Sequence, residues 1–275
     1  MKDLFIVFLT TLTFSFSWGQ SKEEKEVVRV GKLLYKIEAA SWNGTDVLLN
    51  KFGNLRQNIG GYFSYINKGS TWCIFYSKDD YPKVLLTIAF VDDKDATVII
   101  SDQERQLSRL EMHLLVIRQK TMTQLQTDSL FKFYPETNPN VIPLIDKKGK
   151  RAYVLTGPQK EGVVIFGNDY LLTFDDEFKL LEKKSLHKNI LNIEYGKVDS
   201  QDIVATMHTH LPETGELITA TDICTLMLYG KYAKWKQHYV ISDKNVSIWD
   251  CSTNELTMLT REAWDRINNA QKERK

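Results

Sequence analysis

The stretch DIVATMHTH, residues 202–210, limits the possible folds more than any other segment because its pattern predicts a strand with a chemical face. Side chains two residues apart lie on the same face of a strand. We therefore expect His208 and His210 together on one face, with Ile203, Ala205 and Met207 directed into the core. The chain has only five histidines, so this pair on a rigid strand predicts a metal site, since Zn–N distances of about 2.0–2.1 Å tolerate little error.

A third ligand follows within the segment LPETGELITATD. Pro212 and Gly215 favour a turn, and TATD favours the start of a helix that can direct Asp222 back at the strand end. Two imidazoles and one carboxylate leave a fourth position open for water, which is typical of catalytic rather than structural zinc. Thr219 and Asp222 also have the spacing of a helix capping box, which alone would account for both residues.

This motif resembles that of the JAB/MPN (JAMM) metalloprotease family: H-x-H, seven residues, Ser, two residues and Asp, with a Glu on an earlier strand. Here His208-Thr209-His210 is followed by eight residues, then Thr219, two residues and Asp222. The resemblance covers residues 151–259. It implies Zn2+ held by His208, His210 and Asp222, in a deaminase-like mixed sheet with flanking helices.

The resemblance also implies two catalytic residues. Glu161, which opens the strand EGVVIFG, is the candidate general base, although a carboxylate at a strand start can equally be solvated surface. Glu194 in ILNIEYG is the reserve candidate, and Asp169 suits the role less because it falls in an Asn-Asp turn. Thr219 takes the place of the motif Ser and would donate a hydrogen bond to the oxyanion.

The remaining histidines have less informative surroundings. His187 lies in the polar segment LEKKSLHKN, which favours an exposed or structural role. His238 begins the strand HYVIS and can support the metal site from outside or simply pack in the core. His113 lies between Met112 and Leu114 in a helical pattern, which favours packing or a surface position.

Patterning divides the chain into an N-terminal α+β region, residues 20–134, and a C-terminal metal-binding domain, residues 151–275, of α+β or α/β class. In the first region, helical spacing over residues 22–40 is broken at Asn43-Gly44, and STWCIFY, KVLLTIAFV and ATVIIS predict an antiparallel meander followed by a long helix. Residues 135–150, PETNPNVIPLIDKKGK, hold three of the six prolines and predict a linker.

Residues 1–19 predict a signal peptide, because a short basic start, an apolar run and small residues before Gln20 match a secretory leader. We therefore expect a secreted or periplasmic protein without a stable membrane span after cleavage; a membrane-anchored N-terminus is the alternative. The net charge of +1 gives no indication of nucleic acid as a partner. Three sparse cysteines, Cys73, Cys224 and Cys251, do not indicate a disulfide framework, although an oxidising compartment would permit one bond.

Together these features predict an exported, zinc-dependent, JAB/MPN-like hydrolase that cleaves peptide or isopeptide bonds in a peptide or protein substrate. The longer loop and the Thr in place of Ser keep a second hypothesis open. In that hypothesis the chain is a non-catalytic MPN-like module that binds a partner, with or without a metal.

Overall fold

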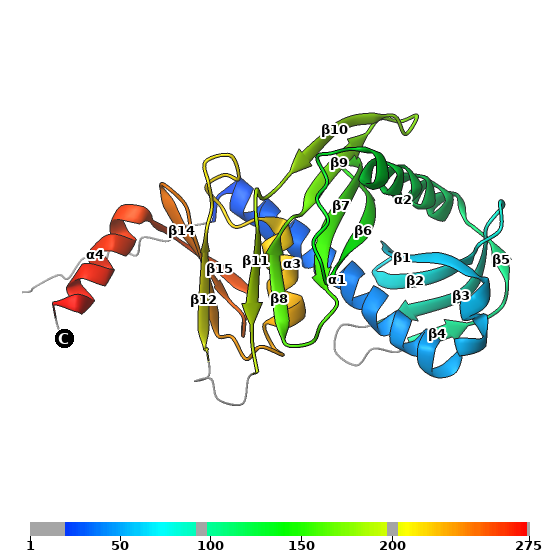
Figure 1. The fold of residues 1–275 in the computed structure, drawn as a ribbon, viewed down its shortest axis with the longest axis horizontal. Coiled ribbons are helices and arrows are strands. Elements are labelled where there is room, and N and C mark those ends of the chain that lie inside the picture. The colour runs from blue at the N-terminus through cyan, green and yellow to red at the C-terminus, as the bar shows by residue number, and fades with distance from the viewer. Residues whose placement is uncertain (1–19, 92–97, 197–202, 274–275) are drawn as a thin grey trace, which may run out of the picture.

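A computed structural model describes residues 20–91, 98–196 and 203–273 (Figure 1). The chain is a mixed α and β protein with several antiparallel sheets and a few helices. The predicted signal peptide, residues 1–19, lies outside the described residues. None of the helices in the described ranges combines the length and apolar character that a membrane crossing requires.

The N-terminal part forms a sheet with the order β1-β2-β3-β4, in which β5 also pairs with β3. The predicted antiparallel meander is confirmed for β2, β3 and β4. Helix α2 begins with a capping box between Ser108 and Glu111. The elements of this part are α1 (Lys22–Lys51), η1 (Gly53–Asn58), β1 (Ile59–Asn67), β2 (Ser70–Ser77), β3 (Lys83–Phe90), β4 (Val98–Ser101), β5 (Arg105–Gln106) and α2 (Arg109–Thr127).

Helix α1 is continuous, so the predicted break at Asn43-Gly44 is wrong. Both glycines of this helix serve close packing instead. A Cβ on Gly44 would lie 2.7 Å from Sγ of Cys73 in β2, and a Cβ on Gly31 would lie 2.6 Å from the Ile223 side chain. The absence of a side chain lets α1 approach the N-terminal sheet at one end and α3 at the other, and this contact outweighs the poor helix propensity of glycine.

Residues 135–150 do not form the predicted linker. Most of the segment is strand β6, which pairs with β7 along its whole length, from Thr137 opposite Pro158 to Asp146 opposite Gly149. Its prolines do not prevent this, because β6 is an edge strand of the sheet β10-β9-β7-β6. The strands of this sheet are β6 (Thr137–Asp146), β7 (Gly149–Pro158), β9 (Tyr170–Phe174) and β10 (Leu180–Ser185).

One hydrophobic cluster contains residues from both predicted regions, so the core continues across the predicted boundary. Leu34 and Ile37 of α1 pack with Ile142 of β6 and with Cys224 and Leu228 of α3. In Figure 1, α1 accordingly extends from the N-terminal sheet, behind the sheet β10-β9-β7-β6, to α3. Buried aliphatic side chains contribute about 1.5–3 kcal/mol each, so this cluster ties both halves of the chain into one core.

The C-terminal part contains β8 (Val163–Gly167), β11 (Ile190–Glu194), β12 (Ala205–Thr209), α3 (Ala220–Tyr229), β13 (Gln237–Ile241), β14 (Asn245–Asp250), β15 (Glu255–Thr260) and α4 (Arg261–Lys272). Strands β8 and β11 form a two-stranded antiparallel sheet, and the other strands form a sheet in the order β12-β13-β14-β15. Strands β12 and β13 are parallel and are connected through α3, whereas β13 and β14 form an antiparallel hairpin. Cys73, Cys224 and Cys251 are free thiols.

Candidate metal centre

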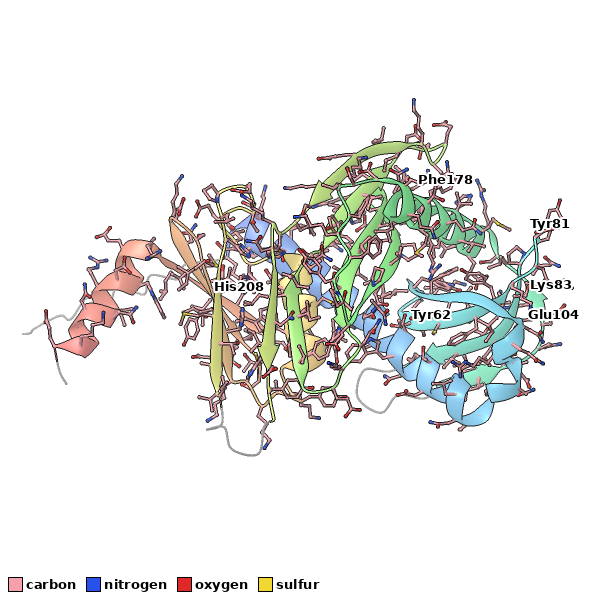
Figure 2. All side chains as sticks on the ribbon, viewed as in Figure 1. Tyr62, Tyr81, Lys83, Glu104, Phe178 and His208 are labelled. Atoms are coloured by element: carbon pink, nitrogen blue, oxygen red, sulfur yellow. The ribbon has the colours of Figure 1, made fainter. Side chains whose placement is uncertain are left out.

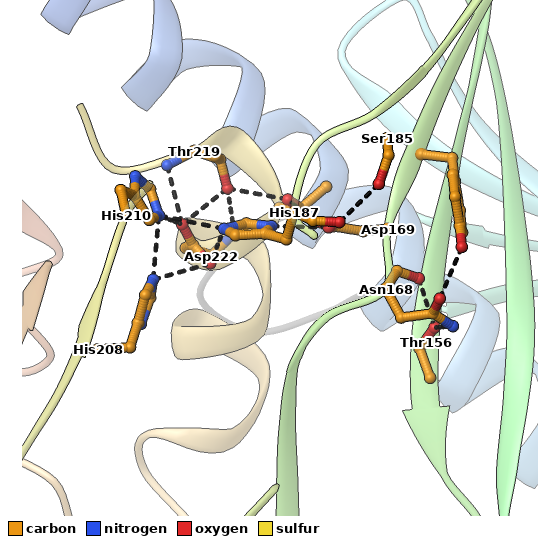
Figure 3. A network of polar contacts seen from close by, with 11 residues as sticks. Thr156, Asn168, Asp169, Ser185, His187, His208, His210, Thr219 and Asp222 are labelled. Atoms are coloured by element: carbon orange, nitrogen blue, oxygen red, sulfur yellow. Dashed lines mark hydrogen bonds and ion pairs between the residues drawn. The ribbon is translucent and has the colours of Figure 1, made fainter. Parts of the chain in front are cut away.

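Four side chains converge beside the N-terminus of α3: His187, His208, His210 and Asp222 (Figure 3). One potential ligand atom from each lies within 4.8 Å of every other. In Figure 2, the sheet β10-β9-β7-β6 lies between His208 and the labelled residues Tyr81 and Glu104 of the N-terminal part. The cluster could hold a metal ion. Its members come from β12 and the residue that follows it, from α3, and from the loop between β10 and β11.

Strand β12 brings two of the imidazoles together, as its alternation predicts, but the burial of its faces is the reverse of the prediction. His210 is 4% exposed, whereas Met207 is 59% exposed. Because β12 ends its sheet beside α3 and β8, the face with the histidines is the interior one. Ile203, Ala205 and Met207, expected to face the core, are all exposed to solvent.

Asp222 is held in place by the capping box at the start of α3. The Thr219 hydroxyl accepts a hydrogen bond from the backbone N–H of Asp222 at 3.0 Å. The Thr219 backbone N–H donates to Oδ2 of Asp222 at 2.9 Å, and the Thr219 hydroxyl lies 2.7 Å from the same oxygen. The capping interaction and the placement of Asp222 in the cluster thus occur together. With Oδ2 fixed in this way, the carboxylate is directed at the histidines.

The distances inside the cluster, from 3.1 to 3.8 Å, are close to the ligand separations around a tetrahedral ion. Nε2 of His210 lies 3.1 Å from Nε2 of His187 and 3.1 Å from Nε2 of His208. Oxygens of Asp222 lie 3.4, 3.8 and 3.4 Å from the three nitrogens in the order of the sequence. Ligands at zinc bond lengths of about 2.0–2.2 Å in a tetrahedron lie about 3.3–3.6 Å apart. Imidazole nitrogens with a carboxylate oxygen are also a donor set that zinc accepts.

Further residues orient the imidazoles from outside the cluster. Nδ1 of His187 donates to Oδ1 of Asp169 at 2.7 Å, and the Thr221 hydroxyl donates to the other oxygen of that carboxylate. Since an ionised carboxylate only accepts hydrogen bonds, Nδ1 of His187 carries a proton. In the neutral ring, which a bound cation would favour, the Nε2 lone pair would then face the cluster. Carboxylate–histidine pairs of this kind are typical of metal centres.

His208 has a corresponding chain of partners. Its Nδ1 lies 2.8 Å from Nε2 of His238, and Nδ1 of His238 lies 2.7 Å from the Thr206 hydroxyl. The ring of Phe166 stacks on His238 with centroids 4.7 Å apart. If His208 binds a cation through Nε2, its Nδ1–H donates to His238, which in turn donates to Thr206. This relay fixes the ring orientation and the tautomer of His208.

The charges of the cluster also suit a cation. Burial disfavours the charged form of His187, yet Asp222 and Asp169 outweigh it and raise the pKa of that ring to about 11. Burial lowers the pKa of His208 to about 4. Burial would raise the pKa of Asp222, but His187 and His208 hold it well below its usual range. Without metal, protonated His187 supplies the positive charge between two carboxylates, a charge that a divalent cation would supply in its place.

The cluster lies at the side of an open cleft of about 480 Å³. His187 and His208 contribute to its wall, and the remaining lining is largely apolar, with Phe166, Leu191 and Met207 among its members. No Asp or Glu lines the cleft among the described residues. A ligand in the cleft can therefore reach the two imidazoles directly.

The structure does not bring Glu161 or Glu194 to the cluster. Glu161 precedes the start of β8, whereas Phe166, which packs against the ring of His208, lies at its end. At about 3.3 Å per residue, the three steps of β8 from Val163 to Phe166 alone span about 10 Å. Glu194 pairs with Val163, so it lies at the same remote end of β8. Thr219 is engaged in the capping box and is not part of the cleft lining.

The residue most clearly underestimated from sequence is His187, which is 8% exposed and belongs to the cluster. One signal could have indicated it. Strands β9 and β10 form a hairpin in which Ser185 pairs with Tyr170, and extending that register by one residue pairs Leu186 with Asp169, so that His187 follows directly beside Asp169. His238 supports His208, as one of the two interpretations of its segment expected. His113 lies in α2 with its ring against Phe178.

Comparison with known proteins yields no match: no family model, no curated protein and no solved structure corresponds to this chain.

Proposed function

We propose that this protein is a zinc-dependent hydrolase of peptide or isopeptide bonds, similar in its chemistry to the JAB/MPN metalloproteases. The observation that carries the proposal is the convergence of His187, His208, His210 and Asp222 at ligand distances beside an open cleft. The order of elements, a strand with both histidines, a helix with Asp222 and a parallel strand followed by a hairpin, is consistent with the motif resemblance.

In this proposal His208, His210 and Asp222 hold the ion. Zinc bound there would polarise the scissile carbonyl and lower the pKa of water. The proton acceptor would be Nε2 of His187 rather than Glu161, because His187 lines the cleft and Asp169 holds its opposite nitrogen at 2.7 Å. Asp169 would keep the ring in the required tautomer and stabilise its charge once the attacking water has given up a proton. His187 would then pass this proton to the leaving amine.

A second candidate function has its own support. With His187 as a fourth ligand the site has no open position, and sites closed by four protein ligands are typical of structural zinc. The distances of 3.1 and 3.4 Å from Nε2 of His187 to His210 and Asp222 are compatible with that role. The protein would then be a metal-stabilised binding module, in agreement with the absence of carboxylates from the described cleft lining.

The His187→Gln variant separates these functions. We would measure zinc content after dialysis, together with the appearance of new peptide termini when the protein is incubated with a mixture of linear peptides. The hydrolase proposal expects His187→Gln to keep close to one zinc per chain while turnover falls by ~10²–10⁴. The His208→Ala, His210→Ala double variant should lose both metal and activity. The matched control His113→Gln should change neither, because its ring lies outside the cluster.

Two outcomes would contradict the hydrolase. If His187→Gln loses zinc as the double variant does, His187 is a ligand and the binding module is the better description. If zinc-loaded wild type produces no new termini from any peptide, the hydrolytic function is wrong even when the metal is bound. The proposed export is tested separately: the N-terminus of the mature protein should be Gln20.

A further inference from the structure

Strand β12 has a free edge along the cleft. It is the outermost strand of the order β12-β13-β14-β15, so within the described ranges only β13 pairs with it. The backbone N–H of His210 donates to the carbonyl of Ile241, and the carbonyl of Val204 accepts from the N–H of Lys236. In a parallel pair both backbone groups of one residue point to the same neighbour. The even-numbered residues therefore face β13, and the backbone groups of Met207 and Thr209 point to the free edge.

Exposed apolar side chains surround the same cleft. Leu191, Met207 and Leu211 are 39%, 59% and 38% exposed, and all three line it. They come from β11, from β12 and from the loop after β12, so three segments place large apolar groups around one hollow. Strand β11 is itself unpaired on the side away from β8 in the described part of the chain. Apolar groups gathered around a hollow are typical of binding sites.

These two features select one class of ligand. An extended peptide can add to a free edge through backbone hydrogen bonds and place alternate side chains in apolar subsites. A strand added to β12 would lie about 4.8 Å from it. His208 stands in the sequence between Met207 and Thr209, whose backbone groups point to that edge. A cleft of about 480 Å³ has the size of sites for small ligands, about 300–1,000 Å³, and accommodates a short peptide segment.

We propose that the cleft binds an extended, unfolded peptide segment as an added strand along Met207 and Thr209, with an apolar side chain against Leu191 and Leu211. The proposal deepens the proposed function and rests on it only for the fate of the bound peptide. The hydrolase would accept linear chains and flexible tails, because a bond inside a folded domain cannot lie along this edge. Peptides with proline at the pairing positions are excluded, since proline has no N–H to donate.

Binding is tested with the full-length, zinc-loaded His187→Gln protein, so that the probe stays intact. The probe is a fluorescein-labelled linear peptide, Gly-Ser-Leu-Val-Leu-Thr-Gly-Ser, and the readout is fluorescence anisotropy. We expect saturable binding that weakens by about tenfold or more when alternate backbone nitrogens of the peptide are methylated, because each methyl group removes a hydrogen-bond donor. Replacing both leucines of the probe with aspartate should abolish binding.

Variants of the protein supply matched controls. Met207→Lys and Leu191→Lys should each weaken probe binding by about tenfold or more. Ile203→Lys should leave it unchanged, because Ile203 is similarly exposed, at 46%, but does not line the cleft. Equal binding of the methylated peptide, or an equal loss in Ile203→Lys, would overturn the proposal. If wild type cleaves methylated and unmethylated peptides equally well, strand addition is wrong but the hydrolase proposal stands. If the probe binds tightly but wild type cleaves no peptide, the hydrolase proposal is wrong but strand addition stands.

Discussion

Gly31→Ala tests the contact by which α1 supports the metal centre. The new Cβ would lie 2.6 Å from both Cβ and Cγ2 of Ile223 and 3.1 Å from the carbonyl oxygen of Ala220. The first distance is 0.8 Å short of ordinary contact at 3.4 Å, and the atoms it meets are not the far end of a flexible side chain. Helices α1 and α3 must therefore move apart. Ile223 follows Asp222, so this movement also displaces a proposed ligand.

The magnitude follows from two opposing effects. Overpacking of a core costs about 1–3 kcal/mol, and replacing a glycine by alanine within a helix returns up to about 1 kcal/mol. We expect a net loss of about 1–2 kcal/mol in the free energy of unfolding, which lowers the melting temperature by about 2–8 °C in a chain of this length. Zinc affinity should fall in the same variant, because the carboxylate of Asp222 moves with the start of α3.

Thermal unfolding followed by circular dichroism, with and without zinc, measures both effects. Gly53→Ala is the control, because nothing lies within 4 Å of a Cβ placed there, and its melting temperature should change little. If Gly31→Ala melts at or above the wild-type temperature and binds zinc equally well, α1 and α3 do not pack in the way described.

Three further substitutions have defined outcomes. Burial raises the pKa of Glu38 from 4.5 to about 7, so the free energy of unfolding falls as the pH rises between these values. In urea unfolding, Glu38→Gln should therefore stabilise the protein by about 3 kcal/mol at pH 8 and make no difference at pH 4. Glu111 is the opposite case: burial would raise its pKa, but Arg105 and other hydrogen-bond donors outweigh this and lower it from 4.5 to about 2. Its stabilisation, about 3 kcal/mol, is present above pH 4.5 and is lost towards pH 2, so the stability difference between wild type and Glu111→Gln should shrink over that range. Asp169→Asn should lower peptide turnover by about 10–100-fold while the variant keeps close to one zinc per chain, and unchanged turnover would contradict the orienting role of Asp169.

The elements that the sequence predicts well are those with a strong local pattern. Strands β2, β3, β13 and β14 follow runs of β-branched and aromatic residues. The sequence predicts a linker where β6 forms, because prolines usually mark a linker, whereas an edge strand with a long antiparallel partner tolerates them. Asn43-Gly44 was misread for a related reason: the contact that favours glycine there comes from β2, about 30 residues away along the chain.

The candidate site shows the same division. His208, His210 and Asp222 share one local motif, and the structure brings them together. His187 depends on the register of the β9–β10 hairpin, and His238 depends on the parallel pairing of β13 with β12. Neither relation is visible as local periodicity. The sequence favours Glu161 because it stands before an apolar strand. In the structure, the other end of β8, near Phe166, is the end that lies beside the cluster.

X-ray absorption of the zinc-loaded protein tests the central claim most directly, namely that the histidine and aspartate cluster holds the metal. We predict one zinc per chain with a first shell of nitrogen and oxygen at about 2.0–2.2 Å and the outer-shell scattering that imidazole rings produce. A first shell containing sulfur at about 2.3 Å would assign the metal to cysteine instead. Such a shell, or a protein that retains no zinc after dialysis, would contradict the account.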